Sequence, residues 1–161
     1  MLRPFVGLCA AGIALATAGC TQEEAQLQVT DAWVRISPVA SNPSAGYFTV
    51  KGGEKAVQLI GVSSPVAIRT EMHETMADHG AGDGNSDGKG HGMTMMKPVT
   101  SVDVPARGTV AFAPGGRHAM FWNINPGIVP PRTMPLVFTF SDGTQIEVAA
   151  RTVAVGAPAP K

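Results

Sequence analysis

From Leu27 onward, apolar residues recur mostly at every second position or in short runs that Gly, Pro, Ser and Asn interrupt. A period of two is typical of strands with one buried face. The 161 residues include 19 glycines and 13 prolines, which are the poorest helix formers. The pattern predicts strands and no helix of ten residues. The predicted strands are residues 27–36, 45–50, 56–63, 66–73, 94–99, 109–113, 118–123, 135–140 and 145–153.

The regular spacing of these short strands indicates the fold class. Strands of similar length separated by turn residues are typical of an antiparallel sandwich or barrel with Greek-key connections. The clearest hairpin is the alternating segment 145–148 behind the turn Ser141-Asp142-Gly143. Trp33 and Ile36 are expected to supply core, whereas residues 156–161 contain two prolines and predict a flexible tail. We therefore expect a single all-β domain.

The N-terminus has the features of an export signal. Arg3 precedes the apolar run 5–16, which is too short to span a bilayer, and small residues follow it. The sequence Ala18-Gly19-Cys20 resembles a bacterial lipobox, although Thr17 stands where leucine is usual; ordinary cleavage after Ala18 is the alternative. We predict a signal over residues 1–19, a lipidated Cys20, a tether over 20–26 and a periplasmic, membrane-anchored lipoprotein.

Charge and cysteine content exclude several classes of function. The chain has 12 basic and 12 acidic residues and no Lys/Arg cluster, so it lacks the basic face that nucleic-acid binding requires. Cys9 lies in the predicted signal and Cys20 is expected to be acylated, which leaves the folded domain without a thiol for a disulfide or for catalysis. Hydrolase, zinc-protease and phosphate-loop motifs are also absent from the sequence. We do not expect an enzyme.

Residues 79–92 contain six glycines and almost no apolar side chain, which predicts a long flexible loop between two strands. Within it, Asp83, Asn85 and Asp87 match the first half of an EF-hand calcium loop. The twelfth position is Thr94 rather than a bidentate glutamate. A polar insertion explains the segment better than a calcium site, which remains the alternative.

Methionine and histidine are concentrated in one part of the chain. Thioethers and imidazoles are neutral donors that need no deprotonation, and thioethers favour Cu(I) over zinc, magnesium or calcium. A second cluster, His118 and Met120, has the i, i+2 spacing that places two side chains on the same face of a strand. The first cluster lies between positions 72 and 96 and comprises Met72, His73, Met76, His79, His91, Met93, Met95 and Met96.

Three segments resemble one known family. Residues 71–75 read Glu-Met-His-Glu-Thr, residues 96–99 read Met-Lys-Pro-Val, and residues 114–120 read Pro-Gly-Gly-Arg-His-Ala-Met. With 21 residues between Met96 and His118, the chain resembles the periplasmic copper(I) chaperones of the PCu(A)C type. It departs from them in having 22 residues rather than ten between His73 and Met96, which the glycine-rich loop explains. Met93 and Met95 therefore remain alternatives to Met96.

The resemblance implies a cupredoxin-like β-barrel or sandwich over residues 27–155. It also implies that His73, Met96, His118 and Met120 hold Cu(I), and that the protein passes copper toward the copper A site of cytochrome c oxidase. The expected partner is subunit II of the oxidase or another assembly chaperone. The alternative is a copper-sequestering or resistance lipoprotein that buffers periplasmic copper. A blue-copper electron carrier is excluded because it needs a thiolate ligand.

Each of these residues also has a structural interpretation. Met120 could simply pack, and Met72 should point to the face opposite His73 and join the core. Trp33, Phe121 and Trp122 are expected to pack in the core or at its rim. The remaining donors could form a secondary copper site, with Cu(II) at the histidines, or be solvated loop residues; they are Met76, His79, His91, Met93 and Met95.

Overall fold

The computed structural model describes residues 24–77 and 94–160. Ten strands and no helix occur in this part of the chain, so no segment of it is a helix that could cross a membrane. The predicted signal, Cys20 and the glycine-rich loop 79–92 lie outside the described residues. The strands are β1 (Gln28–Ile36), β2 (Ser44–Lys51), β3 (Val57–Ser63), β4 (Arg69–Ala77), β5 (Thr94–Val99), β6 (Val102–Val104), β7 (Thr109–Phe112), β8 (Arg117–Trp122), β9 (Thr133–Phe140) and β10 (Gln145–Ala154).

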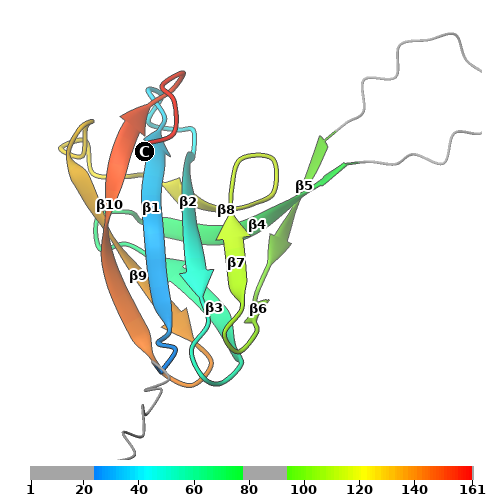
Figure 1. Ribbon diagram of the computed structural model, residues 1–161. Coiled ribbons are helices and arrows are strands. Elements are labelled where there is room, and N and C mark those ends of the chain that lie inside the picture. The colour runs from blue at the N-terminus through cyan, green and yellow to red at the C-terminus, as the bar shows by residue number, and fades with distance from the viewer. Residues whose placement is uncertain (1–23, 78–93, 161) are drawn as a thin grey trace, which may run out of the picture.

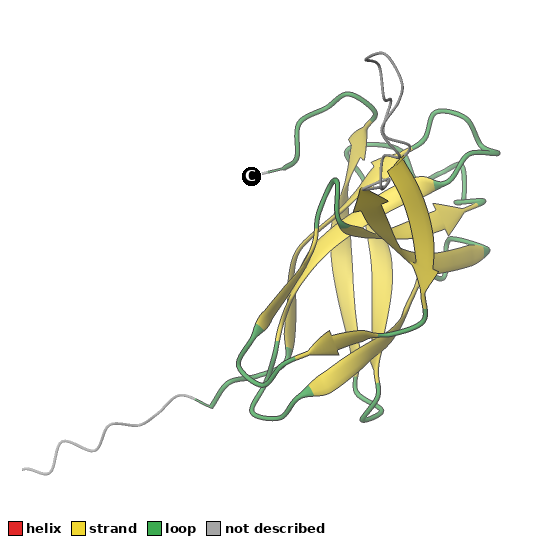
Figure 2. Cartoon of the chain, turned by 90° about the vertical axis from the view of Figure 1, so that its right-hand side faces the viewer, coloured by secondary structure: helices red, strands yellow, loops and turns green. Residues whose placement is uncertain are grey.

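The strands form one sheet that curls into a nearly closed barrel (Figures 1 and 2). Its order is β5-β4-β8-β2-β1-β10-β9-β3-β6, and β7 pairs with the part of β2 that β8 leaves free. All pairs are antiparallel except β1 with β10. The all-β, cupredoxin-like prediction is confirmed. The parallel pair was not predicted, because alternation along one strand carries no information about the direction of its neighbour.

Every predicted strand has a counterpart, with two differences. The predicted strand 66–73 begins later, at Arg69, because a turn precedes it in which the amide of Ala67 donates to the carbonyl of Ser64 at 3.2 Å. It also extends further than predicted, to Ala77. The additional strand β6 has three residues, of which the first and last are buried. Such a short edge strand is below the length at which alternation can be recognised.

Aromatic side chains fill the barrel. Phe48 stacks on Phe112 with ring centroids 4.2 Å apart and meets the edge of Phe138 at 4.7 Å. Phe121 belongs to the same core, whereas Trp33 is buried outside it against Tyr47, with ring centroids 4.5 Å apart. Because β2 and β9 are separated in the sheet by β1 and β10, the contact between Phe48 and Phe138 packs strands together across the barrel core. The largest fully buried side chains are Phe48, Phe112, Phe121, Phe138, Phe140, Leu59, Met134 and Leu136.

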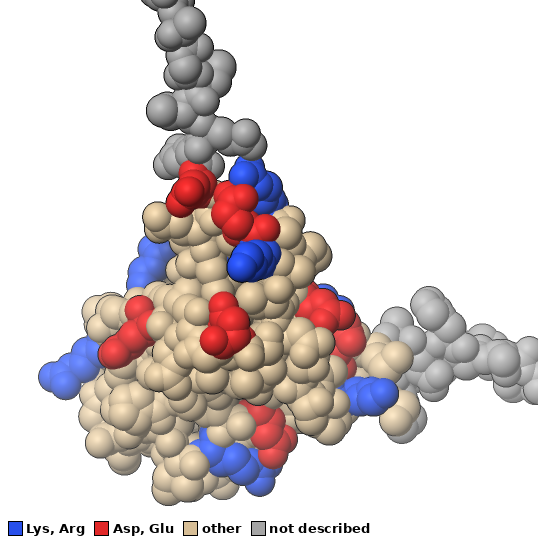
Figure 3. Space-filling model, turned by 90° about the horizontal axis from the view of Figure 1, so that it is seen from below, with Lys and Arg blue, Asp and Glu red and all other residues tan. Residues whose placement is uncertain are grey.

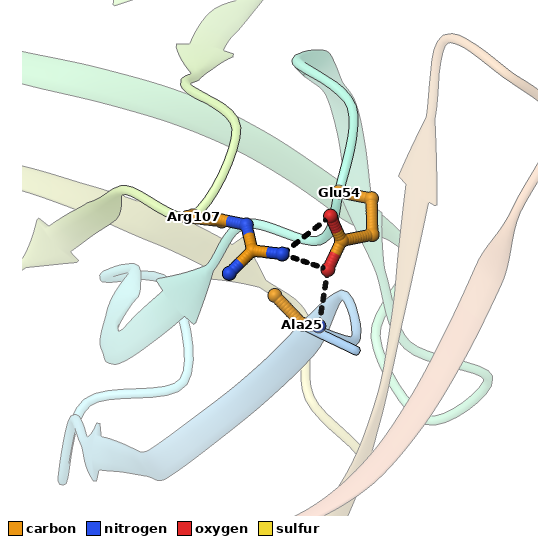
Figure 4. Close-up of polar contacts among 3 residues, drawn as sticks. All are labelled: Ala25, Glu54 and Arg107. Carbon is orange, nitrogen blue, oxygen red and sulfur yellow. Dashed lines mark hydrogen bonds and ion pairs between the residues drawn. The ribbon is translucent and has the colours of Figure 1, made fainter. Parts of the chain in front are cut away.

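An ion pair fastens the start of the described chain to one end of the barrel (Figure 4). The Arg107 guanidinium lies 2.7 Å from both carboxylate oxygens of Glu54, and the backbone amide of Ala25 donates to the same carboxylate at 2.6 Å. These contacts, that of Arg107 foremost, hold the pKa of Glu54 below its ordinary value. Figure 3 views the molecule from below, and on that face acidic and basic side chains are interspersed.

Glu54 predicts a small acid sensitivity. Because its pKa is lower in the folded state, its contribution to stability is present above the ordinary glutamate pKa of about 4.3 and is lost as pH falls through the lowered value. The melting temperature of Glu54→Gln should therefore lie below that of the wild type at neutral pH, with the gap closing in acid. Exposed Glu147→Gln is the control and should show no such gap. A gap that is constant with pH would contradict the prediction.

Candidate metal centre

The two histidines of the predicted ligand set lie side by side on adjacent strands. His73 on β4 is the direct register partner of His118 on β8, and their ring centroids are 5.9 Å apart. Cross-strand partners project from the same face of a sheet. Two segments that are 45 positions apart in the sequence thus place their imidazoles side by side.

The same face carries both methionines of the predicted set. Met120 lies opposite Glu71 on β4, two residues from His73, and Met96 on β5 lies opposite Thr75, two residues on the other side. Because side chains alternate along a strand, these residues share the face of His73 and His118. Their strand neighbours Met72, Ala119 and Phe121 point the other way and are buried in the core. The topology therefore brings His73, Met96, His118 and Met120 to one surface of the barrel.

His118 is held with one ring nitrogen available. Its side chain is buried, with 5% relative exposure, and Nδ1 lies 3.0 Å from the carbonyl oxygen of Gly116. A carbonyl only accepts, so Nδ1 carries the proton and Nε2 of the neutral ring keeps its lone pair. The turn 113–116, closed by the amide of Gly116 donating to Ala113, sets this carbonyl in place.

His73 has the opposite arrangement. Its Nε2 lies 3.0 Å from a carboxylate oxygen of Glu71, whereas Nδ1 is buried and has no hydrogen-bond partner among the described residues. A buried polar atom without a partner is costly in a folded protein. If Nε2 donates to the carboxylate, the neutral ring has a lone pair on Nδ1. An unpartnered nitrogen of this kind is suited to bind a metal ion.

Sequence reasoning missed the residues that support His73. The guanidinium of Arg69 lies 3.1 Å from Glu71 and also stacks 4.0 Å from the ring of Trp122, which is itself 6.2 Å from the ring of His73. Arg69, Glu71, His73 and Trp122 thus form one connected layer. The i, i+2 spacing of Glu71 and His73, which places both on one strand face, was a signal that could have revealed the pair.

The arrangement offers soft, neutral donors. Two imidazoles and two thioethers lie on one sheet face, with Met120 half-buried and Met96 56% exposed. Within residues 24–77 and 94–160, no three His, Cys, Asp or Glu side chains converge as zinc or calcium would need. Such a donor set suits a soft metal ion such as copper better than zinc or calcium.

The other candidate donors lie elsewhere or outside the description. Met76 and Met95 are on the face opposite His73, and Met72 belongs to the core, as expected. His79, His91 and Met93 lie outside the described residues, as do the calcium-like positions 83, 85 and 87. Of the two alternatives to Met96, Met95 points away from the histidines because it is the register partner of Met76.

The sequence over residues 27–152 matches the family model described as "Putative lipoprotein LpqE-like". The chain belongs to the LpqE-like family. A relative from Leifsonia xyli subsp. xyli, named "Putative lipoprotein Lxx21020", is 28% identical to this LpqE-like chain over 124 residues, which cover 76% of the chain and 67% of the relative.

Solved structures share the fold of this LpqE-like chain. The copper-bound PCuAC domain from PmoF2 aligns with a TM-score of 0.58 and 18% identity over 81% of this chain and 97% of that domain. Solution structures of DR1885 from Deinococcus radiodurans also align. The apo form has a TM-score of 0.54 and 22% identity over 94% and 97% of the two chains; the copper(I) form has 0.53 and 23% over 84% and 82%. The resemblance to PCu(A)C proteins is confirmed at the level of the fold.

Proposed function

We propose that this protein binds one Cu(I) ion tightly through His73, Met96, His118 and Met120 and delivers it to another protein outside the cytoplasm. The observation that carries the proposal is that two cross-strand imidazoles and two thioethers occupy one sheet face, with Met96 and Met120 on the strands that flank His73. Two solved structures with the same fold are described as copper-bound, which supports copper as the cargo. The proposed imidazole donors are Nδ1 of His73, which has no hydrogen-bond partner among the described residues, and Nε2 of His118, whose Nδ1 contacts the carbonyl of Gly116.

The geometry suits transfer better than storage. No thiolate is present in the set, so Cu(I) is held without a strong anionic bond. Met96 projects from the edge strand β5 and is more than half exposed, whereas both histidines lie on strands that are paired on each side. An incoming donor can therefore replace the Met96 sulfur first, while the imidazoles still hold the ion.

The acceptor and location are part of the proposal. The LpqE-like family and its Leifsonia relative are named as lipoproteins, which supports a lipid anchor at Cys20 and a position outside the cytoplasm. The resemblance to PCu(A)C chaperones points to the copper A site in subunit II of cytochrome c oxidase, or to another assembly chaperone, as the acceptor. The second candidate function is a copper buffer, which the exposed methionines on β4 and β5 favour.

An anaerobic Cu(I) titration against a chromophoric chelator tests the proposal. The protein lacking residues 1–20 retains every described residue and should bind one equivalent tightly. That equivalent should survive deletion of residues 79–92 and should move to an apo acceptor domain when the two are mixed. Absence of tight Cu(I) binding would overturn the proposal. Several equivalents of similar affinity that are lost with the loop would favour the buffer.

Glu71 should control the affinity of the site through His73. Removing a carboxylate that orients a ligating histidine typically costs ten- to a hundredfold in metal affinity. We expect a loss of that size in Glu71→Ala and a smaller one in Glu71→Gln, whose amide oxygen can still accept from Nε2. The measurement is the Cu(I) dissociation constant by chelator competition.

Glu74 supplies the matched control. Its side chain has the same 39% exposure as that of Glu71 and is likewise paired with an arginine, Arg117 at 3.0 Å, but it lies on the opposite face of β4. Glu74→Ala should leave Cu(I) affinity unchanged. Equal losses in the two alanine variants would show that strand stability, rather than the orientation of His73, causes the effect.

A further inference from the structure

The pair β4 and β5 extends beyond the barrel as a two-stranded ribbon (Figure 1). Met76 and Met95 are direct register partners there. Directly opposed residues of antiparallel strands have Cβ atoms about 5 Å apart, which brings two thioethers within reach of one ion. Since Met76 is three positions from His73, this methionine pair lies on the face opposite the proposed Cu(I) site.

Core packing does not account for the pair. Met76 is 52% exposed and Met95 is 63% exposed, whereas Met72, on the same face of β4, is only 5% exposed. The face therefore leaves the core between Met72 and Met76. Two flexible apolar side chains held side by side in solvent bury little area and stabilise the fold little.

The surroundings of the pair select a soft ion. Among residues 24–77 and 94–160, the charged neighbours on this face are Glu74, Lys97 and Arg117. Glu74 pairs with Arg117 at 3.0 Å and is the register partner of Lys97 on β5. The one carboxylate in this group is thus engaged by an arginine. A divalent ion that prefers oxygen donors finds no free carboxylate among these described residues, whereas thioethers bind a soft monovalent ion without charge compensation.

We propose that Met76 and Met95 form a second Cu(I) site, weaker than the first, which passes copper around the edge strand to Met96. This inference rests on the proposed function for the identity of the ion. Met95 and Met96 are consecutive on β5, and β5 has a strand neighbour on one side only. Transfer is ligand exchange: copper–sulfur bonds to Met76 and Met95 break as bonds to Met96 and the imidazoles form, and copper stays Cu(I) with no proton or electron transferred.

The test combines Cu(I) titration with NMR of ¹³C-methyl-labelled methionine. The wild type should bind one tight equivalent, followed by one at least about tenfold weaker, because two donors replace four. The Met76 and Met95 methyl signals should shift only during the weaker step. The double variant Met76→Leu/Met95→Leu should lose that step and keep the tight one. The control Met134→Leu, a volume-conserving change at a buried methionine, should keep both.

The outcomes separate this inference from the proposed function. A weaker equivalent that persists in the double variant, or that disappears only on deletion of residues 79–92, would overturn the methionine pair and leave the tight site intact. Methyl signals of Met76 and Met95 that do not shift at any step of the titration would also overturn the methionine pair and leave the tight site intact. If the tight equivalent is absent but the double variant removes a weak one, the proposed function fails while the pair stands.

Discussion

His118→Ala should abolish tight Cu(I) binding, with affinity falling by about a hundredfold or more. His118 is the register partner of His73 across the ladder and lies two residues from Met120 on its own strand. Loss of a group that only orients a ligand already costs up to about a hundredfold, so loss of the ligand itself should cost at least as much. Chelator competition under anaerobic conditions measures the change.

The alanine variant also removes the bond from Nδ1 to Gly116, so a second variant is needed. In His118→Asn the side-chain amide can donate to that carbonyl, but no imidazole Nε2 remains. Both variants should lose tight Cu(I) binding. The asparagine variant should keep a melting temperature closer to that of the wild type. Tight Cu(I) binding by a folded His118→Asn protein would remove His118 from the ligand set.

Phe138→Ala should destabilise the barrel by about 3–5 kcal/mol. Phe138 is completely buried and meets Phe48, so truncation leaves a cavity that strands from both sides of the barrel line. Denaturant unfolding measures the change in the free energy of unfolding. Val129→Ala, at a side chain that is 52% exposed, should change it by less than about 0.5 kcal/mol.

The same variant tests how independent the metal centre is of the core. Strand β9, which carries Phe138, is separated in the sheet from β8 and β4 by β10, β1 and β2. Below its melting temperature, Phe138→Ala should therefore bind Cu(I) with nearly unchanged affinity. A large loss of affinity in the folded variant would show that the geometry of His73 and His118 depends on the whole barrel.

Local patterns in the sequence predicted most of the fold. Alternation and turn residues located nine of the ten strands because a strand with one buried face alternates apolar and polar residues along its own sequence. They failed at β6, which is too short, and at Pro65 to Ile68, where apolar residues form a turn. Strand order and the parallel β1–β10 pair depend on contacts between distant segments, which no local pattern encodes.

The candidate site was predictable in composition but not in geometry. The spacing of His118 and Met120 showed that they share a face, and the family resemblance added His73 and Met96. The cross-strand register that places His73 beside His118 came from the structure alone. So did the roles of Glu71 and Arg69, because a charged residue on an exposed strand face has the same sequence signature whether or not it orients a ligand.

The position of β5 at the open edge of the sheet affects how the ion leaves. An edge strand is bonded to one neighbour, so its amides can exchange with solvent through local fraying that costs far less than unfolding the barrel. Met96 lies on this strand, while His73 and His118 lie on β4 and β8, which are protected on both sides. The rate at which the Met96 sulfur dissociates from the ion would then depend on the free energy of opening one strand edge rather than on the global stability of the protein.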